Sequence, residues 1–275
     1  MVTPSSEFIF KALPNGLQLL CREVGDAILA VAEHNTQFKA DDSPVTAADV
    51  AAHQLLAAGL PKLLDLPVVS EECPAIGRVG VPQQGLFWLV DPLDGTKEFI
   101  AGNDDFAVCV ALMQDLAPRF GFIYQPRTGI AYWGGAESGS SMGRNSRAAI
   151  HKLQARRAHF DEPLVALVSR QGASREASWI QQLSRHWPSG VLQQPMGSAL
   201  KACALAAGKA DFYPRRGRTC IWDTAAAQAI LQGAGGEFLN LQGEALRYDA
   251  QSLYNPEFIA VADKSLPWLD LLGIR

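Results

Sequence analysis

WLVDPLDGTKEF, at residues 88–99, combines an apolar strand with a turn that carries two carboxylates. The strand stops abruptly at Asp91, and a short helix is expected from Thr96. Asp91 and Asp94 are three residues apart on a turn that a proline stiffens, so both can converge on one cation, and oxygen ligands suit Mg²⁺. Gly95 lets the backbone approach a ligand closely, and the N–H groups of Gly95 and Thr96 would point at a phosphate. One short segment therefore predicts both halves of a metal–phosphate site.

Three other structures share features with this turn. A plain structural turn, with Asp94 capping the next helix, is compatible because Asp, Pro and Gly are common turn residues. A calcium loop needs oxygen ligands at its first, third and fifth positions, but the third is Leu93 and the fifth is Gly95 here. A phosphatase with an aspartyl nucleophile is typified by Asp-x-Asp-Gly-Thr, and the spacing here is one residue longer. The last two do not match, and the plain turn stays open.

Four further acidic residues could join the same site. Glu71 and Glu72 follow an apolar strand, and one of them could reach the cation if the two strands are neighbours. Alone, this pair is typical of a solvated loop. Asp223 starts an Ala-rich helix, where an aspartate is also an ordinary N-cap. Asp49 follows Val-Thr-Ala-Ala, and alone it is typical of an acid on a helix surface.

Composition and charge narrow the class of protein. The 275 residues are 48% hydrophobic, and the net charge of −4 comes without a Lys/Arg run, which argues against nucleic-acid polymers as partners. Five cysteines without a CxxC pair argue against a disulfide framework or a zinc site and favour a reducing compartment, the cytoplasm. No apolar run reaches the ~18 residues of a membrane span, although peripheral contact with the inner membrane stays open. Composition, charge and cysteine content do not indicate an oligomeric state.

Hydrophobic periodicity and turn signals predict mixed α and β layers rather than a simple doubly wound sheet. Helices are expected at 16–38, 46–59, 175–186, 198–207 and 223–234, with Thr46 capping the second helix and Gly59 and Pro61 ending it. Strands are expected at 67–70, 86–90, 106–113, 119–124, 130–133, 164–168, 211–214 and 258–261. The stretch from 134 to 162, rich first in Gly and Ser and then in Arg and Lys, is the expected passage between two lobes, 1–150 and 151–275.

Seven segments occur in the same order as in a known superfamily. They read SPVTAAD, SEE, WLVDPLDGTKEF, SR, MGSALK, DFYPR and IWDTAA. Over about residues 17–262 the chain resembles the inositol monophosphatase superfamily, and most closely its bacterial 3'(2'),5'-bisphosphate nucleotidase (CysQ-type) branch, of which Lys97-Glu98-Phe99 after DGT is typical. The resemblance implies an α/β fold, a layered αβαβα sandwich with the site between two lobes.

The resemblance also implies a role for each matching residue. The ligands of two or three Mg²⁺ ions would be Glu71, Asp91, the Leu93 carbonyl, Asp94 and Asp223. Glu72 would assist catalysis next to these ligands without binding a metal ion itself. Asp49 and Thr96 would orient and deprotonate the attacking water. The substrate would be contacted by Gly95, Thr96, Ser169, Ser198, Lys201, Arg215 and Asp223.

The implied activity is Mg²⁺-dependent hydrolysis of the 3'-phosphate of adenosine 3',5'-bisphosphate, in sulfur metabolism and nucleotide recycling, with inhibition by lithium. Two alternatives stay open, namely the same chemistry on an inositol phosphate or sugar bisphosphate, and a non-catalytic nucleotide or metal sensor. A P-loop NTPase is disfavoured because no GxxxxGK[ST] motif occurs. GGAESGSSMG, at 134–143, is expected to be a hairpin or linker rather than a phosphate loop.

Two positions depart from the pattern of the branch. Its members commonly read Ser-Arg-Ser-His where this chain has Ser-Arg-Gln171-Gly172, and the missing histidine weakens the expectation for base recognition. Ala227 stands where glycine is usual, a change that a helix tolerates because alanine is a strong helix former.

Overall fold

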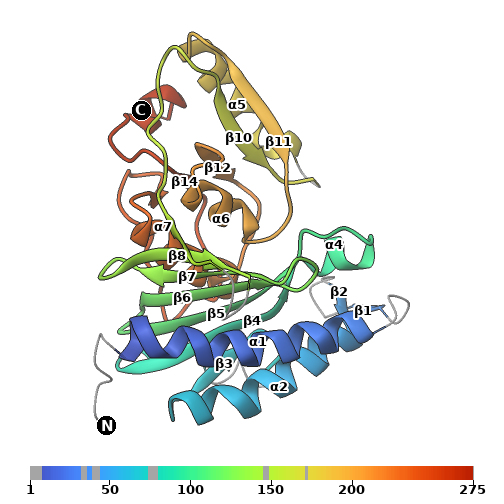
Figure 1. Cartoon of the computed structure of the whole chain (residues 1–275). Coiled ribbons are helices and arrows are strands. Elements are labelled where there is room, and N and C mark those ends of the chain that lie inside the picture. The colour runs from blue at the N-terminus through green and yellow to red at the C-terminus, as the bar shows by residue number, and fades with distance from the viewer. Residues whose placement is uncertain are drawn as a thin grey trace.

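The computed structural model of the chain describes residues 8–31, 36–38, 44–73, 80–144, 149–170 and 173–274 (Figure 1). Two β-sheets and three layers of helices are stacked in the order α, β, α, β, α. The predicted αβαβα sandwich is therefore confirmed. A single-turn π-helix, η1 (Phe8–Ala12), precedes the first layer.

The larger sheet has seven strands, and two long helices cover one of its faces. The strands follow the order β3-β4-β5-β6-β7-β8-β9, and only β3 and β4 are parallel. Their bounds are β3 (Val68–Ser70), β4 (Leu86–Asp94), β5 (Ala107–Gln114), β6 (Ala117–Gln125), β7 (Ile130–Gly135), β8 (Gly139–Gly143) and β9 (His151–Leu153). The covering helices are α1 (Leu13–Ala30) and α2 (Ala47–Leu63), which bury an apolar cluster that includes Leu17 and Leu56 against Trp88.

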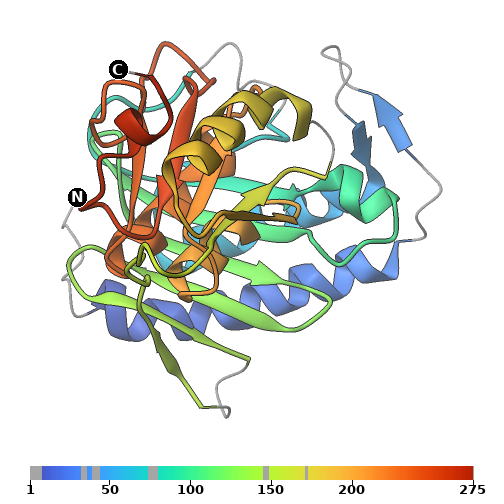
Figure 2. The same ribbon diagram turned by 90° about the horizontal axis from the view of Figure 1, so that it is seen from above.

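The smaller sheet has five strands in the order β11-β10-β12-β14-β13. Their bounds are β10 (Leu164–Val168), β11 (Val191–Pro195), β12 (Phe212–Arg215), β13 (Glu237–Asn240) and β14 (Phe258–Val261). Between the two sheets lie α6 (Leu200–Ala206) and α7 (Ile221–Gly233), and on the outer face lie α5 (Ala173–His186) and α8 (Trp268–Leu271) (Figure 2). The central helices thus touch both sheets and can carry side chains to a site between them.

Helix α7 packs directly on the larger sheet. A Cβ on Gly121 of β6 would lie 2.0 Å from the carbonyl oxygen of Ala226, so only glycine permits this approach. The middle of the helix is almost wholly buried, from Thr224 to Leu231. This contact fixes the height of α7 above the sheet and hence the position of its first turn.

Two helix predictions were wrong at their C-terminal ends. The first helix stops at Ala30 instead of residue 38, because 36–38 form the strand β1 (Thr36–Phe38), which pairs with β2 (Pro44–Thr46). The second helix passes through Pro61 to Leu63. Close packing of α2 against α1 outweighs the cost of the backbone hydrogen bond that proline cannot donate. A Cβ on Gly59 would lie only 2.4 Å from Leu20 of α1.

The predicted strands are all present, with ends shifted by up to four residues. Missed were β1, β2, β8, β9, β11 and β13, and the short helix α8. GGAESGSSMG contains the β7–β8 hairpin turn, as predicted. The segment expected to join the two lobes contributes β8 and β9 to the larger sheet, so that only residues 154–163 connect the two sheets. The two-lobe division stays a prediction, with residues 151–153 still in the larger sheet.

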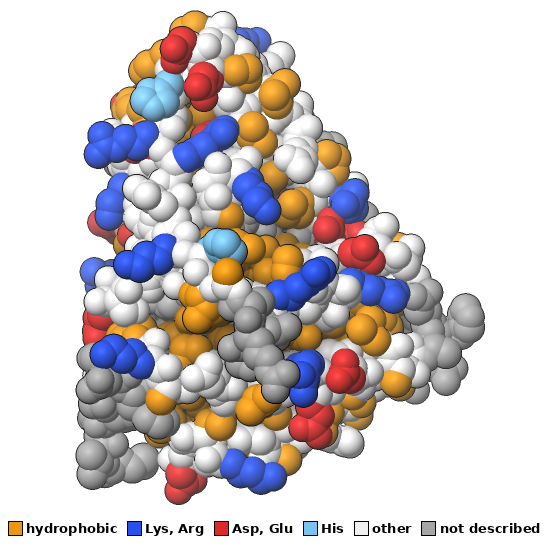
Figure 3. Space-filling model, in the orientation of Figure 1, with side chains coloured by type: hydrophobic (Ala, Val, Ile, Leu, Met, Phe, Trp, Pro, Cys, Tyr) orange, Lys and Arg blue, Asp and Glu red, His pale blue; other side chains and the backbone are white. Residues whose placement is uncertain are grey.

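Two observations bear on nucleic-acid and membrane partners, whose expected absence stays a prediction. On the face in Figure 3, Lys and Arg side chains stand apart from one another among apolar and acidic ones, unlike the continuous stripe of a nucleic-acid-binding face. Within the part of the chain that the structure describes, every helix is too short or too polar to cross a membrane.

Replacing Gly121 tests the contact between α7 and the sheet. We expect Gly121→Ala to lower the melting temperature by roughly 5–10 °C, because its Cβ overlaps a backbone oxygen that cannot move alone. The control is Gly190→Ala, whose φ of 81° is strained but whose Cβ would meet nothing within 4 Å. It should lose only roughly 2–4 °C in the same thermal melt. Equal losses in the two variants would contradict the packing argument.

Candidate metal and phosphate site

Three carboxylates from three elements meet at one edge of the larger sheet. Glu71 directly follows β3, Asp91 lies in β4, and Asp223 lies in the first turn of α7. One ligand oxygen from each falls within 4.8 Å of the other two. Because β3 and β4 are parallel neighbours with Ser70 opposite Val90, their carboxyl ends lie together, which is the condition that the sequence set for Glu71 to reach the cation.

Backbone hydrogen bonds orient two of these carboxylates. Asp91 Oδ1 accepts from the Leu93 N–H at 3.0 Å, within the irregular stretch where β4 shifts register against β5. Asp223 Oδ2 accepts from the Cys220 N–H at 2.9 Å. Cys220 is the N-cap of α7, so Asp223 is the third residue of a capping box and not the cap itself.

Burial and repulsion from neighbouring carboxylates disfavour the charged forms of Asp91 and Asp223. Asp91 is only 3% exposed, and burial, followed by the charges of Glu71 and Asp94, raises its pKa well above the usual value. Burial, followed by Asp94 and Glu71, likewise raises the pKa of Asp223. Like charges at this separation in a low-dielectric site are stabilised by a bound cation, and an all-oxygen ligand set is what Mg²⁺ and similar hard cations take. The residues therefore fit a divalent metal ion.

Asp94 lies beside this group but outside the set of three. Its Oδ2 accepts a hydrogen bond from the Ala199 N–H, and burial raises its pKa to about 6. It lines the same cleft as Glu71, Asp91 and Asp223. Its role as a metal ligand, like that of the Leu93 carbonyl, stays a prediction.

Thr96 and Asp49 form a hydrogen-bonded pair next to the turn. The Thr96 hydroxyl can donate to Asp49 Oδ1 or to the Leu93 carbonyl, each 3.1 Å away. Asp49 Oδ2 accepts from both the N–H and the hydroxyl of Thr46, at 2.7 Å each, in the capping box of α2. The reading of Asp49 as a surface acid was wrong, since it is 3% exposed. Gly95 has a φ of 94°, which gives the turn its sharp exit before α4 (Thr96–Ile100).

The carboxylates line an open cleft of roughly 300 Å³ between the two sheets. Its wall contains the expected substrate residues Gly95, Thr96, Ser169, Ser198, Lys201, Arg215 and Asp223. It also contains Thr219 and Phe238, which the sequence did not single out, and Glu98, Gly197 and Tyr213, which lie in the quoted motifs but had no expected role. No motif marked Thr219 or Phe238, because only the packing of the sheets on α6 and α7 brings them to the cleft.

Lys201 is buried rather than extended into the cleft. Its Nζ donates to the carbonyls of Ser198 and Met196, at 2.9 and 3.3 Å, and lies 4.8 Å from the centre of the Tyr213 ring. Burial lowers its pKa to about 8. Lys201 therefore shapes this wall through the backbone, and direct contact with a substrate stays a prediction.

The remaining expectations have mixed outcomes. Glu72 is half-buried and, of the described residues, is not among those that line the cleft, so its role stays a prediction. Gln171 and Gly172 lie outside the described residues. Ala227 packs in the core of α7 with 2% exposure and lines the floor of the cleft. Cys220 is half-buried, and burial raises its pKa, so its thiol is a poor nucleophile.

Comparison with known proteins decides the family. The model of the Inositol monophosphatase family matches residues 5–266. The chain belongs to the inositol monophosphatase family.

Curated members of the family extend this result. The chain is 40% identical over 246 residues to the 3'(2'),5'-bisphosphate nucleotidase CysQ of Salmonella typhimurium, covering 87% of this chain and 95% of that protein. The CysQ of Haemophilus influenzae is 31% identical, with 85% and 86% covered. Among solved structures, CysQ of Bacteroides thetaiotaomicron aligns with a TM-score of 0.77 at 32% identity over 92% of this chain and 97% of that one. The Thermotoga maritima IMPase, at 21% identity and a TM-score of 0.71 over 94% of each chain, shows the same fold.

The carboxylate cluster of this inositol monophosphatase family member should destabilise the metal-free protein at neutral pH. Because burial raises the folded-state pKa values of Asp91, Asp94 and Asp223, the folded state binds more protons than the unfolded state above about pH 4. Stability is therefore lost as the pH rises through about 6 and beyond. We expect Asp91→Asn to raise the melting temperature in chelator at about pH 7.5, and to raise it less at about pH 5.

Asp161→Asn, at an exposed carboxylate, is the matched control and should change neither melting temperature. A lower melting temperature for metal-free Asp91→Asn at neutral pH would contradict the assignment of repulsion to this cluster.

Proposed function

We propose that the protein is a Mg²⁺-dependent phosphatase that hydrolyses the 3'-phosphate of adenosine 3',5'-bisphosphate to AMP and phosphate. The observation that carries this proposal is the cluster of Glu71, Asp91 and Asp223 at the base of the cleft. The identity of 40% to proteins named 3'(2'),5'-bisphosphate nucleotidase, over nearly their whole length, supports the choice of substrate.

Charge in the cleft supports an anionic substrate once a cation is bound. Lys97, Lys201 and Arg215 line the cleft together with the carboxylates. Burial raises the pKa values of Asp94 and Asp223, and Arg215 is close enough to both carboxylates to offset part of that rise. The protein is acidic as a whole, and bound metal ions would reverse the sign of the field where a phosphate must enter.

The proposed metal ligands are those that the family resemblance implies. Glu71, Asp91 and the Leu93 carbonyl would hold one Mg²⁺, and Asp91, Asp94 and Asp223 would hold one or two more. Bound Mg²⁺ would supply positive charge to the phosphate oxygens and lower the pKa of a water. Most of the protein's own work in phosphoryl transfer is positioning and charge stabilisation.

Thr96 and Asp49 are the residues that we assign to the attacking water. The Thr96 Oγ1 can accept a hydrogen bond from a water while it donates its own proton to Asp49 Oδ1. Asp49 stays oriented because its other oxygen is held by Thr46. The pair would thus align a lone pair of the water with the phosphorus and favour loss of its proton. Gly95 would let the scissile phosphate approach the backbone.

The compartment follows from the thiols. All five cysteines are free, which suits a reducing environment, and we propose the cytoplasm. Nothing among the described residues favours the peripheral membrane contact that the sequence left open.

Phosphate release from a substrate panel tests the proposal. We expect strong release from adenosine 3',5'-bisphosphate that requires Mg²⁺ and falls with added lithium, and weak release from inositol 1-phosphate and fructose 1,6-bisphosphate. Asp91→Asn should lose at least about 10³-fold in kcat, because a shared metal ligand is removed, while Asp161→Asn keeps full activity. Preference for inositol 1-phosphate or fructose 1,6-bisphosphate would overturn the nucleotide assignment. Binding of the nucleotide without release of phosphate would favour a sensor instead.

A further inference from the structure

Ser198, in the wall of the cleft, has a backbone conformation that serine rarely adopts. Its φ is 52°, in the left-handed region where an L side chain crowds the following carbonyl. Residues other than glycine remain in this region only when their surroundings hold them there, and such strain gathers at binding sites. The contacts that hold Ser198 therefore bear on the shape of the cleft.

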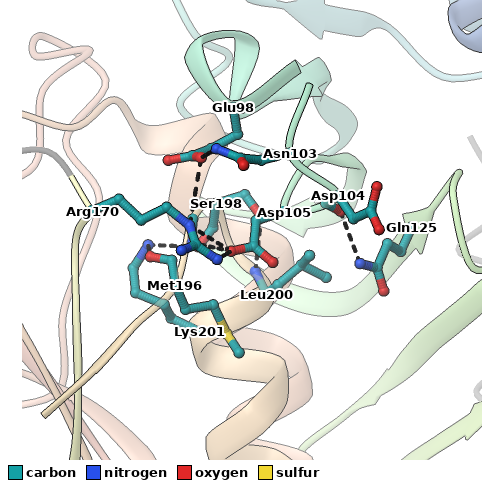
Figure 4. A network of polar contacts seen from close by, with 11 residues as sticks. Glu98, Asn103, Asp104, Asp105, Gln125, Arg170, Met196, Ser198, Leu200 and Lys201 are labelled. Atoms are coloured by element: carbon teal, nitrogen blue, oxygen red, sulfur yellow. Dashed lines mark hydrogen bonds and ion pairs between the residues drawn. The ribbon is translucent and has the colours of Figure 1, made fainter. Parts of the chain in front are cut away.

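The backbone N–H groups of the residues on both sides of Ser198, Gly197 and Ala199, donate hydrogen bonds to carboxylates from the N-terminal half of the chain. The Gly197 N–H donates to Asp105 Oδ2 at 3.0 Å, and the N–H that follows Ser198 donates to Asp94 Oδ2. From within the C-terminal half, Lys201 Nζ donates to the Ser198 carbonyl at 2.9 Å (Figure 4). Asp105, Asp94 and Lys201 thus hold the turn at three points. Of the two carboxylates, Asp94 is a proposed metal ligand and Asp105 is not.

Asp105 also binds the guanidinium of Arg170. The Nε and Nη2 of Arg170 donate to the same Oδ2 oxygen at 3.1 and 2.6 Å, and Arg170 Nε lies 3.6 Å from Glu98 Oε2 (Figure 4). One oxygen of Asp105 therefore accepts from two segments of the C-terminal half, one after β10 and one before α6. Both segments line the cleft, through Ser169 and Ser198 respectively.

The backbone packs so tightly around Asp105 that two neighbouring positions have no room for a side chain. A Cβ on Gly95 would lie 2.9 Å from the Asp105 carbonyl oxygen and 3.2 Å from the Ser198 Cβ. A Cβ on Gly197 would lie 2.8 Å from the same oxygen and 2.6 Å from the Glu98 Cγ. Because these contacts involve backbone, a shift at Asp105 is passed to both the DGT turn and the Ser198 turn.

We propose that Asp105 is a positioning residue for the phosphatase: it fastens the Ser169 and Ser198 segments of the C-terminal half against the Gly95 turn and so sets the substrate-binding wall of the cleft. The proposal rests on the proposed function. Arg170 supplies the positive charge that holds the Asp105 carboxylate next to the Gly197 N–H, and it also pairs with Glu98. Neither residue touches the reacting phosphate, so their effect is on substrate binding more than on the chemical step.

The test is steady-state phosphate release from adenosine 3',5'-bisphosphate at saturating Mg²⁺. We expect Asp105→Ala to raise KM about tenfold with kcat within about threefold of the unaltered protein, since ground-state contacts are loosened while Asp91 and Thr96 keep their places. Asp105→Asn retains an oxygen that can accept from the Gly197 N–H, so it should recover part of the loss. This graded rescue distinguishes positioning from a general loss of folded protein.

Asp104→Ala is the matched control, because Asp104 is the adjacent aspartate and its side chain is 67% exposed in an ion pair with Arg127. It should leave KM and kcat unchanged. A second route uses Arg170→Ala, at a side chain 41% exposed, which should raise KM on its own and add little to Asp105→Ala in the double variant. If Asp105→Ala does not fold, Arg170→Ala and Asp105→Asn decide the question.

An unchanged KM in folded Asp105→Ala, or a fall in kcat alone that tracks a lower melting temperature, would overturn the positioning role. Fully additive effects of the two substitutions on KM would also overturn it. If the unaltered protein does not hydrolyse the nucleotide, the proposed function fails and this assignment fails with it. The unaltered protein in the same assay therefore separates the two failures.

Discussion

The repulsion among one buried and two half-buried carboxylates at the end of β3 and β4 is the interaction on which the rest of the site depends. Glu71, Asp91 and Asp223 place oxygens within 4.8 Å of one another, and the burial of Asp91 removes most of the water that would otherwise screen its charge. Such a cluster lowers the stability of the folded chain unless a cation or a proton compensates it. Its presence is best explained by the binding of metal, for which the protein gives up stability in the metal-free state.

The fold supplies the forces that hold these charges together. Parallel pairing of β3 with β4 fixes two of the acids relative to each other, with the Glu71 N–H donating to the Val90 carbonyl at 3.1 Å. The third comes from α7, which the close approach of Gly121 to Ala226 seats on the sheet. The apolar core between the sheets therefore brings together acids that are about 150 residues apart in the chain.

The turn at Asp91 and Asp94 was visible in the sequence because its signals are local, whereas Glu71 and Asp223 joined it only through the family resemblance, and their metal roles stay a prediction. Asp91 and Asp94 follow an apolar strand in a distinctive turn, and the order of seven motifs indicated the family and hence the layered sandwich. The burial of Asp49 was not predicted: its capping box with Thr46 is local, but its contact with Thr96, 47 residues away, depends on the fold.

The wall of the cleft was predicted less completely, for a physical reason. Tyr213 and Phe238 reach it only through the stacking of the second sheet on α6 and α7, which no spacing along the chain encodes. The contact of Asp105 with Arg170 likewise joins residues 65 positions apart. Strands such as β11 and β13 were missed because their burial is partial and their sequences do not alternate. In α2 the error runs the other way: Pro61 is a strong local helix breaker, but tertiary packing overrides it and the helix continues to Leu63.

The position of a bound metal ion tests most directly whether Glu71, Asp91 and Asp223 hold a cation. Crystals grown or soaked with Mn²⁺, which replaces Mg²⁺ and scatters anomalously, would be used to compute an anomalous difference map. We expect a peak within coordination distance of carboxylate oxygens from Glu71, Asp91 and Asp223, and its loss in Asp91→Asn. A map with no peak in the cleft, or a peak bound elsewhere while the three carboxylates remain without metal, would contradict it.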